Sequence, residues 1–157
     1  MTDRPFQEFY PEDVAHCYGC GYRNEHGHRI ASRWDGDEAV CVFRPKPYHT
    51  SFVGYVYGGL IASLIDCHSM GAAAAAWMRA NGMEIGRDPA VRFVTASLKV
   101  DYLLPTPLGG DLVIRARAVE IGARKVVVDS EVLAEGVVTA RGHTVAVRMP
   151  EHLIPER

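Results

Sequence analysis

A single aspartate interrupts the most apolar stretch of the chain. Asp66 directly follows Leu60–Ile65, where the leucine and isoleucine spacing predicts a helix whose side chains are mostly buried. Removing a carboxylate from water costs roughly several kcal/mol unless a hydrogen bond or a counter-charge compensates it. Asp66 therefore lies on an exposed stripe, or pairs with a structural arginine, or serves as a base or nucleophile in a cleft.

Two glycines precede the same helical stretch. The first N–H groups of a helix have no intrahelical acceptor, so Gly58 and Gly59 could present them to a developing oxyanion. The plainer alternative is a tight turn into the helix. Asp66 lies eight residues beyond Gly58, which corresponds to about 12 Å along the axis. Both groups would reach one carbonyl if antiparallel helices of a two-fold dimer formed two composite sites.

A second group of candidate ligands lies near the N-terminus. Cys17 and Cys20 form a Cys-x2-Cys pair, which is half of a common structural zinc site. We predict no metal there, because the histidines that would complete the site are separated by a single residue, an unusual spacing. Cys67 is a neighbour of Asp66, faces another direction on the helix and is expected to pack in the core. The histidines near the pair are His16, His26 and His28.

Sequence periodicity predicts the elements that position these residues. Residues 58–80 form the one long helix, whose small and apolar residues indicate that a sheet covers it closely. Residues 91–104 alternate strictly, which predicts a strand with Thr95 and Ser97 on one face. Short turns between sequential strands favour antiparallel pairing. The remaining strands are predicted at 29–34, 38–43, 112–120, 124–134 and 137–148, after an irregular segment over residues 1–28.

Composition and charge exclude several classes of protein. The chain has 157 residues, of which 48% are hydrophobic and 23% charged, as expected for a single domain over 1–157. Its 17 basic and 19 acidic residues give a net charge of −2, which argues against nucleic-acid and membrane-surface partners. No apolar run reaches the roughly 20 residues of a membrane span, and a secretory signal pattern is absent. With four cysteines, we expect a cytoplasmic protein with reduced thiols.

Taken together, these motifs resemble one family. Tyr57-Gly58-Gly59-x6-Asp66 is similar to the His-Gly-Gly-x6-Asp motif of hotdog-fold acyl-CoA thioesterases, in the PaaI-like (phenylacetyl-CoA thioesterase) branch. The resemblance implies an α+β hotdog fold, an antiparallel sheet wrapped around one long central helix, in agreement with the element order above. Further matching segments, in the same order over most of the chain, are Cys17-Tyr18-Gly19-Cys20-Gly21 with Asn24 and Gly27, Val94–Leu98 with Tyr102 and Pro105, and Gly122-x-Arg124.

The resemblance implies a catalytic set. By position, Asp66 would activate water or attack the thioester carbonyl itself, and Thr95 would hold Asp66 or the water. The amide of Gly58 would polarise the carbonyl. Tyr57 replaces the histidine of the family and would position the glycine amide. Because a thiolate is a good leaving group, a base and an oxyanion donor suffice for the reaction.

Other residues are assigned to substrate contact by the same resemblance. Ser51 stands at a position that is often asparagine in the family, and His49 lies in the same loop. Arg124 and Lys125 are candidates to anchor the nucleotide phosphates of coenzyme A. The remaining candidates are Gly59 and Ser97 as substrate contacts, Arg115 and Arg117 as alternative phosphate anchors, and Phe52, Tyr55, Tyr57, Trp77 and Met83 along an acyl or aryl tunnel.

The resulting expectation is the hydrolysis of an acyl-CoA or aryl-CoA thioester to a free acid and coenzyme A. The resemblance implies a homodimer or a dimer of dimers, with neither a metal nor a redox cofactor. A non-catalytic protein that binds or senses acyl-CoA is the alternative, because Tyr57 and Ser51 depart from the family pattern. A hotdog hydratase is a third option, although the helix lacks the paired histidine and acid usual for that reaction.

Overall fold

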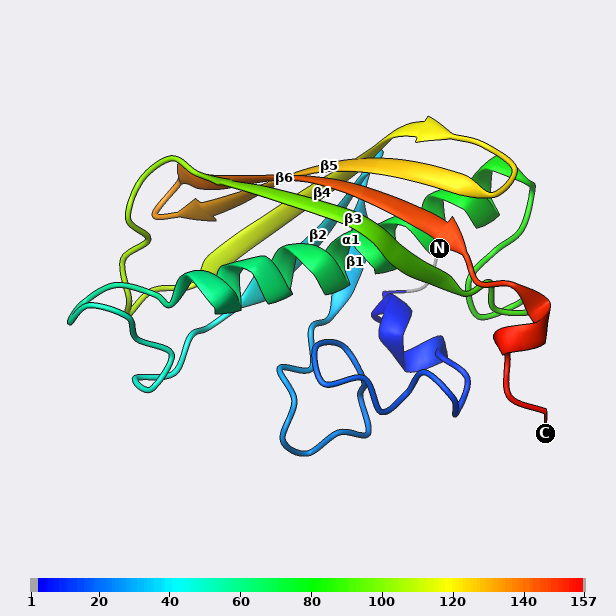
Figure 1. Cartoon of the computed structure of the whole chain (residues 1–157), viewed down its shortest axis with the longest axis horizontal. Helices are drawn as coiled ribbons and strands as arrows, with labels where there is room; N and C mark the ends of the chain where they lie inside the picture. Colours follow the sequence, from blue (N-terminus) through cyan, green and yellow to red (C-terminus); the bar gives the residue numbers. More distant parts are fainter. Residues whose placement is uncertain (1–2, 157) are drawn as a thin grey trace.

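One six-stranded antiparallel sheet covers one side of a single long helix, and the N-terminal segment lies against another side of it (Figure 1). The computed structural model describes residues 3–156. The strands lie in the order β1-β2-β4-β5-β6-β3, so the predicted antiparallel sheet around one long helix is confirmed. The elements are η1 (Phe6–Phe9), β1 (Ser32–Asp35), β2 (Glu38–Phe43), α1 (Gly58–Ala80), β3 (Phe93–Tyr102), β4 (Leu112–Ile121), β5 (Lys125–Ala134), β6 (Val137–Arg148) and η2 (Glu151–Leu153).

The helix α1 runs over the predicted residues, because its large apolar side chains recur at three- and four-residue spacing and pack under the sheet. Leu64 and Ile65 are completely buried. Close approach of helix and sheet depends on small residues: a Cβ on Gly142 of β6 would overlap the side chain of Ile65. At the C-terminal end of α1, the side-chain amide of Asn81 donates a hydrogen bond to the Trp77 carbonyl at 2.8 Å and closes the last turn.

By length and mean hydropathy, α1 is a helix that could cross a membrane, so the expectation that no apolar stretch is long enough for a span is wrong. However, 61% of the most apolar stretch of this helix is buried inside the protein. Packing against the sheet therefore accounts for this composition, as it does for other core helices.

The strand β3 departs from the predicted alternation at a β-bulge. Its pairing with β6 shifts between Thr95 and Ser97, so Ala96 is an extra residue on this strand. Phe93 packs against the core before the bulge and Val100 packs against it after the bulge. The prediction that Thr95 and Ser97 share a face is therefore wrong, since one inserted residue exchanges the two faces of a strand.

Side-chain hydrogen bonds fix the N-terminal segment in place. Gln7 donates to the Ser32 hydroxyl at 3.0 Å and accepts from the Ser32 amide at 2.8 Å. Arg92, just before β3, donates twice to Asp13, at 2.6 and 2.7 Å. The first strand begins three residues later than predicted, because Arg29 has a φ of 52°, in the left-handed region that a strand does not contain.

Candidate active site

Asp66 on α1 meets Thr95 on β3. The Thr95 hydroxyl donates a hydrogen bond to Asp66 Oδ1 at 2.5 Å, and Asp66 is half-buried. The bond leaves Oδ2 of the carboxylate available to a further donor such as water. A carboxylate that is held in one orientation by a single hydroxyl has the geometry required of a general base or a nucleophile.

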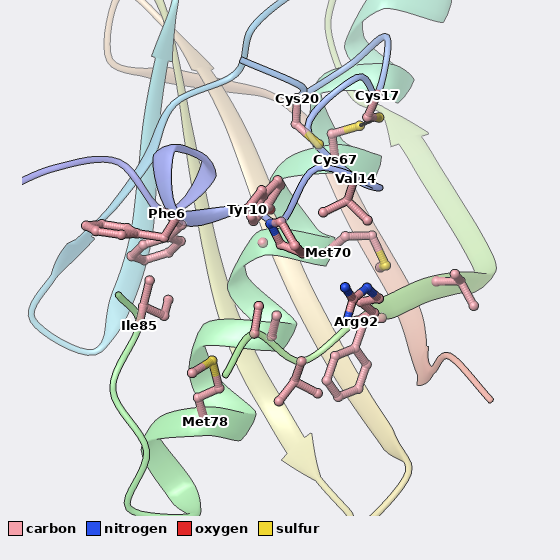
Figure 2. A pocket seen from close by; sticks show the side chains of 18 of the residues that line it. Phe6, Tyr10, Val14, Cys17, Cys20, Cys67, Met70, Met78, Ile85 and Arg92 are labelled. Carbon is pink, nitrogen blue, oxygen red and sulfur yellow. Dashed lines mark hydrogen bonds between the residues drawn. The ribbon is translucent and has the colours of Figure 1, made fainter. Parts of the chain in front are cut away.

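The Asp66–Thr95 pair lies on the wall of a cavity of about 430 Å³. The cavity is bounded by the N-terminal segment, the adjoining face of α1 and the segment that leads into β3 (Figure 2). Its other lining side chains are mostly apolar, as in most small-molecule sites. They include Phe6, Tyr10, Val14, Met70, Met78 and Ile85.

These apolar residues are not the ones that the sequence suggested for an acyl tunnel. None of Phe52, Tyr55, Tyr57, Trp77 and Met83 lines this cavity within residues 3–156, and Phe52 is 84% exposed. Helical spacing was the usable signal on α1, because Met70, Ala74 and Met78 follow Asp66 at steps of four. No comparable sequence pattern predicts that the N-terminal segment lines the cavity, since its position depends on the long-range contacts of Gln7 and Asp13.

The start of α1 has unsatisfied backbone donors. Tyr57 is the N-cap residue, and its side chain makes no capping hydrogen bond. The Leu60 amide already donates to the Tyr57 carbonyl at 3.1 Å. Among the described residues of the first turn, the N–H groups of Gly58 and Gly59 are therefore the ones available to a ligand. Tyr57 lies so close to Gly59 that any Cβ on residue 59 would overlap the phenol ring. From β3, the Tyr102 hydroxyl donates to the Gly58 carbonyl at 2.7 Å and fixes this end of the helix beside the sheet edge.

His49 and Ser51 belong to the loop that precedes α1. His49 Nδ1 accepts a hydrogen bond from the Lys46 amide at 2.9 Å, and the His49 carbonyl accepts one from the Tyr57 amide at 2.9 Å. Burial lowers the pKa of His49, which favours the neutral imidazole. The Ser51 hydroxyl reaches the Val56 carbonyl at 3.5 Å. Both residues thus help to hold the loop that carries Tyr57 and Gly58.

The predicted site residues form two groups in one chain. Asp66 and Thr95 lie together at mid-helix, whereas His49, Ser51 and the glycine pair lie at the helix start. Eight residues along α1 separate Gly58 from Asp66, which again corresponds to about 12 Å. One chain therefore places the candidate base and the candidate oxyanion donors apart from each other.

The candidate phosphate anchors differ in their partners. Arg115 is shared between Asp35 at 2.9 Å and Glu38 at 2.8 Å, and Arg117 also contacts Glu38 at 3.4 Å. Lys125 lies 3.2 Å from a surface glutamate. Arg124 is exposed, and within the described part of the chain no side chain neutralises it. Arg124 is therefore the most accessible of these cations. Ser97, the other predicted substrate contact, lies beyond the bulge, on the opposite face of β3 from Thr95.

A cluster of three cysteines adjoins the cavity and was not predicted. Cys67 packs against the core as expected, but its sulfur also lies within 4.8 Å of the sulfurs of Cys17 and Cys20. The histidines do not join them: among the described residues the cluster contains cysteines alone, and His16 instead contacts Glu12 at 2.9 Å. The sequence contains no pattern that predicts this cluster, because the cluster forms only when the fold brings the N-terminal turn onto α1.

Comparison with known proteins matches residues 53–141 to the thioesterase superfamily. Among curated proteins, acyl-coenzyme A thioesterase THEM4 of Xenopus laevis is 37% identical over 87 residues. The match covers 55% of this chain and 33% of the relative, so the chain spans about a third of that protein's length.

Solved structures share the architecture. A thioesterase superfamily protein from Shewanella loihica is 46% identical, with a TM-score of 0.66 over 81% of this chain and 96% of its own. The E. coli PaaI protein, from the phenylacetic acid degradation operon, is 18% identical, with a TM-score of 0.64 over 78% and 81%. Streptococcus mutans smu.793, solved bound to acetyl CoA, is 19% identical, with a TM-score of 0.63 over 76% and 88%. The last two similarities concern the fold alone.

Proposed function

The chain belongs to the thioesterase superfamily, and we propose that it hydrolyses an acyl-CoA or aryl-CoA thioester to a free acid and coenzyme A. One observation carries the proposal: Asp66 is held by Thr95 on the wall of an apolar cavity. A carboxylate oriented beside a space that suits an acyl or aryl group is the minimum that hydrolysis of an apolar thioester requires.

In the proposed reaction, Asp66 takes a proton from water as the water oxygen attacks the thioester carbonyl carbon. The tetrahedral intermediate carries the negative charge on the former carbonyl oxygen, where backbone N–H donors stabilise it. The C–S bond then breaks, and the thiolate leaves and takes up the proton from Asp66. Thr95 fixes Oδ1 of Asp66 so that Oδ2 faces the water.

The oxyanion donors would come from a second copy of the chain. β3 is the last strand of the sheet, and its edge exposes Val94, Leu98 and Tyr102. Exposed, unpaired edge strands readily pair with another chain. Antiparallel pairing of two β3 strands across a two-fold axis would bring the Thr95 end of one strand near the Tyr102 end of the other. Because Tyr102 holds Gly58, the helix start of one copy would then approach Asp66 of the other.

The thioester would extend from the cavity to the surface. The apolar walls suit an acyl or aryl group, and the exposed guanidinium of Arg124 suits a CoA phosphate. The acetyl-CoA complex of smu.793 supports a CoA thioester as the ligand class for this fold. Tyr57, in place of the family histidine, favours one alternative, a protein that binds acyl-CoA without hydrolysing it.

The test is the release of free thiol from short, medium, long and aromatic acyl-CoAs by the wild type, Asp66→Asn and Asp37→Asn. Asp66→Asn preserves shape but removes the base, so we expect the rate to fall by about 10²-fold or more. Asp37→Asn is the matched control, because Asp37 is 89% exposed in the turn between β1 and β2, at the sheet edge opposite β3, and should leave turnover unchanged. Equal turnover by the wild type and Asp66→Asn would refute the assignment of Asp66, and saturable binding without any turnover would identify the non-catalytic alternative.

A further inference from the structure

Three thiols from two distant segments meet at one end of the cavity (Figure 2). The sulfur atoms of Cys17, Cys20 and Cys67 all lie within 4.8 Å of one another. Those of Cys17 and Cys67, 50 residues apart in the chain, are separated by 3.9 Å. Around tetrahedral zinc, with Zn–S bonds of about 2.3 Å, neighbouring sulfurs lie about 3.8 Å apart. The spacing of the Cys17 and Cys67 sulfurs therefore matches that of thiolates which share one cation.

The turn that carries Cys17 and Cys20 is shaped around the third sulfur. Gly19 lies so close to Cys67 that a Cβ on residue 19 would overlap its Sγ. The turn is closed by a hydrogen bond of 2.8 Å from the Gly21 amide to the Cys17 carbonyl.

Cysteine binds a cation of this kind as the thiolate, so binding by the three residues would release the protons that their thiols carry.

We propose that Cys17, Cys20 and Cys67 bind a thiophilic divalent cation of the zinc class. All three residues line the cavity, which also contains Asp66, so the cavity has room for a fourth ligand such as water. A bound cation would tie the N-terminal turn to α1 one residue from Asp66. The site is independent of the hydrolytic reaction proposed above, since that reaction needs no metal.

The test is zinc binding to the reduced, metal-free protein, measured by competition with a chromophoric chelator. The wild type should bind one equivalent. Cys17→Ser should bind at least about 10-fold more weakly, because loss of a ligand costs no less than loss of an outer-shell partner. Cys17 is exposed, so this variant is expected to fold, and circular dichroism checks that it does. His16→Gln is the matched control for the neighbouring histidine and should bind zinc as the wild type does.

A second measurement reports the ligand type directly. Cobalt bound to the wild type should show thiolate-to-metal charge-transfer absorption that Cys17→Ser weakens. Asp66→Asn should keep the zinc stoichiometry, which separates this proposal from the fate of the hydrolase proposal. If the reduced wild type takes up no zinc, the three-thiol site is overturned. It is also overturned if His16→Gln weakens zinc binding as much as Cys17→Ser does. Formation of a disulfide by the wild type in place of zinc uptake would also overturn it, in favour of a redox pair.

Discussion

Asp66 and His68 are two residues apart on α1, yet their surroundings differ in the features that matter for function. His68 is completely buried on the sheet side, and both ring nitrogens have partners, the Ser32 hydroxyl at 2.8 Å and the Ala39 carbonyl at 3.0 Å. Asp66 is half-buried on the cavity side, where Thr95 engages one carboxylate oxygen. Both are polar interruptions of an apolar helix, so polarity alone does not identify a site. A polar group identifies a site when it keeps a hydrogen-bonding position beside a cavity, as Asp66 does.

The largest expected effect on the His68 side is a dependence of stability on pH. Burial lowers the pKa of His68 to about 4, against an ordinary value of 6.5 for an unfolded chain. The unfolded state therefore binds this proton first as the pH falls, and the free energy of unfolding decreases between pH 6.5 and about 4. The contribution of this group to the free energy of unfolding is fully present above pH 6.5, and about 3 kcal/mol of it should be lost by about pH 4.

Urea unfolding at a series of pH values measures that decrease. His68→Gln should be less stable at neutral pH, and it should lose this component of the pH dependence, which isolates the histidine from the carboxylates. A variant whose pH dependence equals that of the wild type would show that His68 is not protonated on unfolding in this range.

A second change disturbs the sheet side without touching the cavity. Gly142→Ala on β6 would place a methyl group against Ile65 and Ser130, so overpacking should cost about 1–3 kcal/mol of unfolding free energy. Gly110→Ala is a suitable comparison, because nothing lies within 4 Å of a Cβ there. Denaturant unfolding measures both variants, and equal stability of the two would contradict the close packing of α1 under β6.

The smallest effect is expected at the hydroxyl beside Asp66. Thr95→Val removes the hydrogen bond to Oδ1 and should lower kcat/KM by about tenfold, equivalent to about 1.4 kcal/mol. Thr95→Ser retains the hydroxyl and should recover most of the activity. If Thr95→Val and Thr95→Ser are equally active, Thr95 does not position Asp66.

The sequence predicts the two sides of α1 unequally. The sheet side follows from helical spacing, which correctly places Leu64 and Ile65 in the interior. The Asp66–Thr95 contact is consistent with what the family resemblance implies for these two positions. The bulge at Ala96 has no signal in the alternation, because an extra residue is recognised only when β3 is paired with β6.

The cavity side depends on contacts between residues far apart in the chain. The N-terminal segment contains no regular pattern that could predict its position, yet Gln7 and Asp13 fix it against β1 and the start of β3. The thiol cluster has the same origin, since Cys67 joins Cys17 only through this packing. Local patterns therefore suffice for the helix and most strands, and fail where long-range packing assembles a site.

The most direct test of this account is kcat/KM for thioester hydrolysis by Asp66→Asn beside His68→Gln, measured where both variants are folded. The account predicts that Asp66→Asn loses about 10²-fold or more while its unfolding free energy changes little. His68→Gln should keep a kcat/KM within a few-fold of the wild type, although its stability is lower. Retained activity in Asp66→Asn, or an equal loss in both variants, would contradict the claim that the cavity-facing carboxylate performs the chemistry.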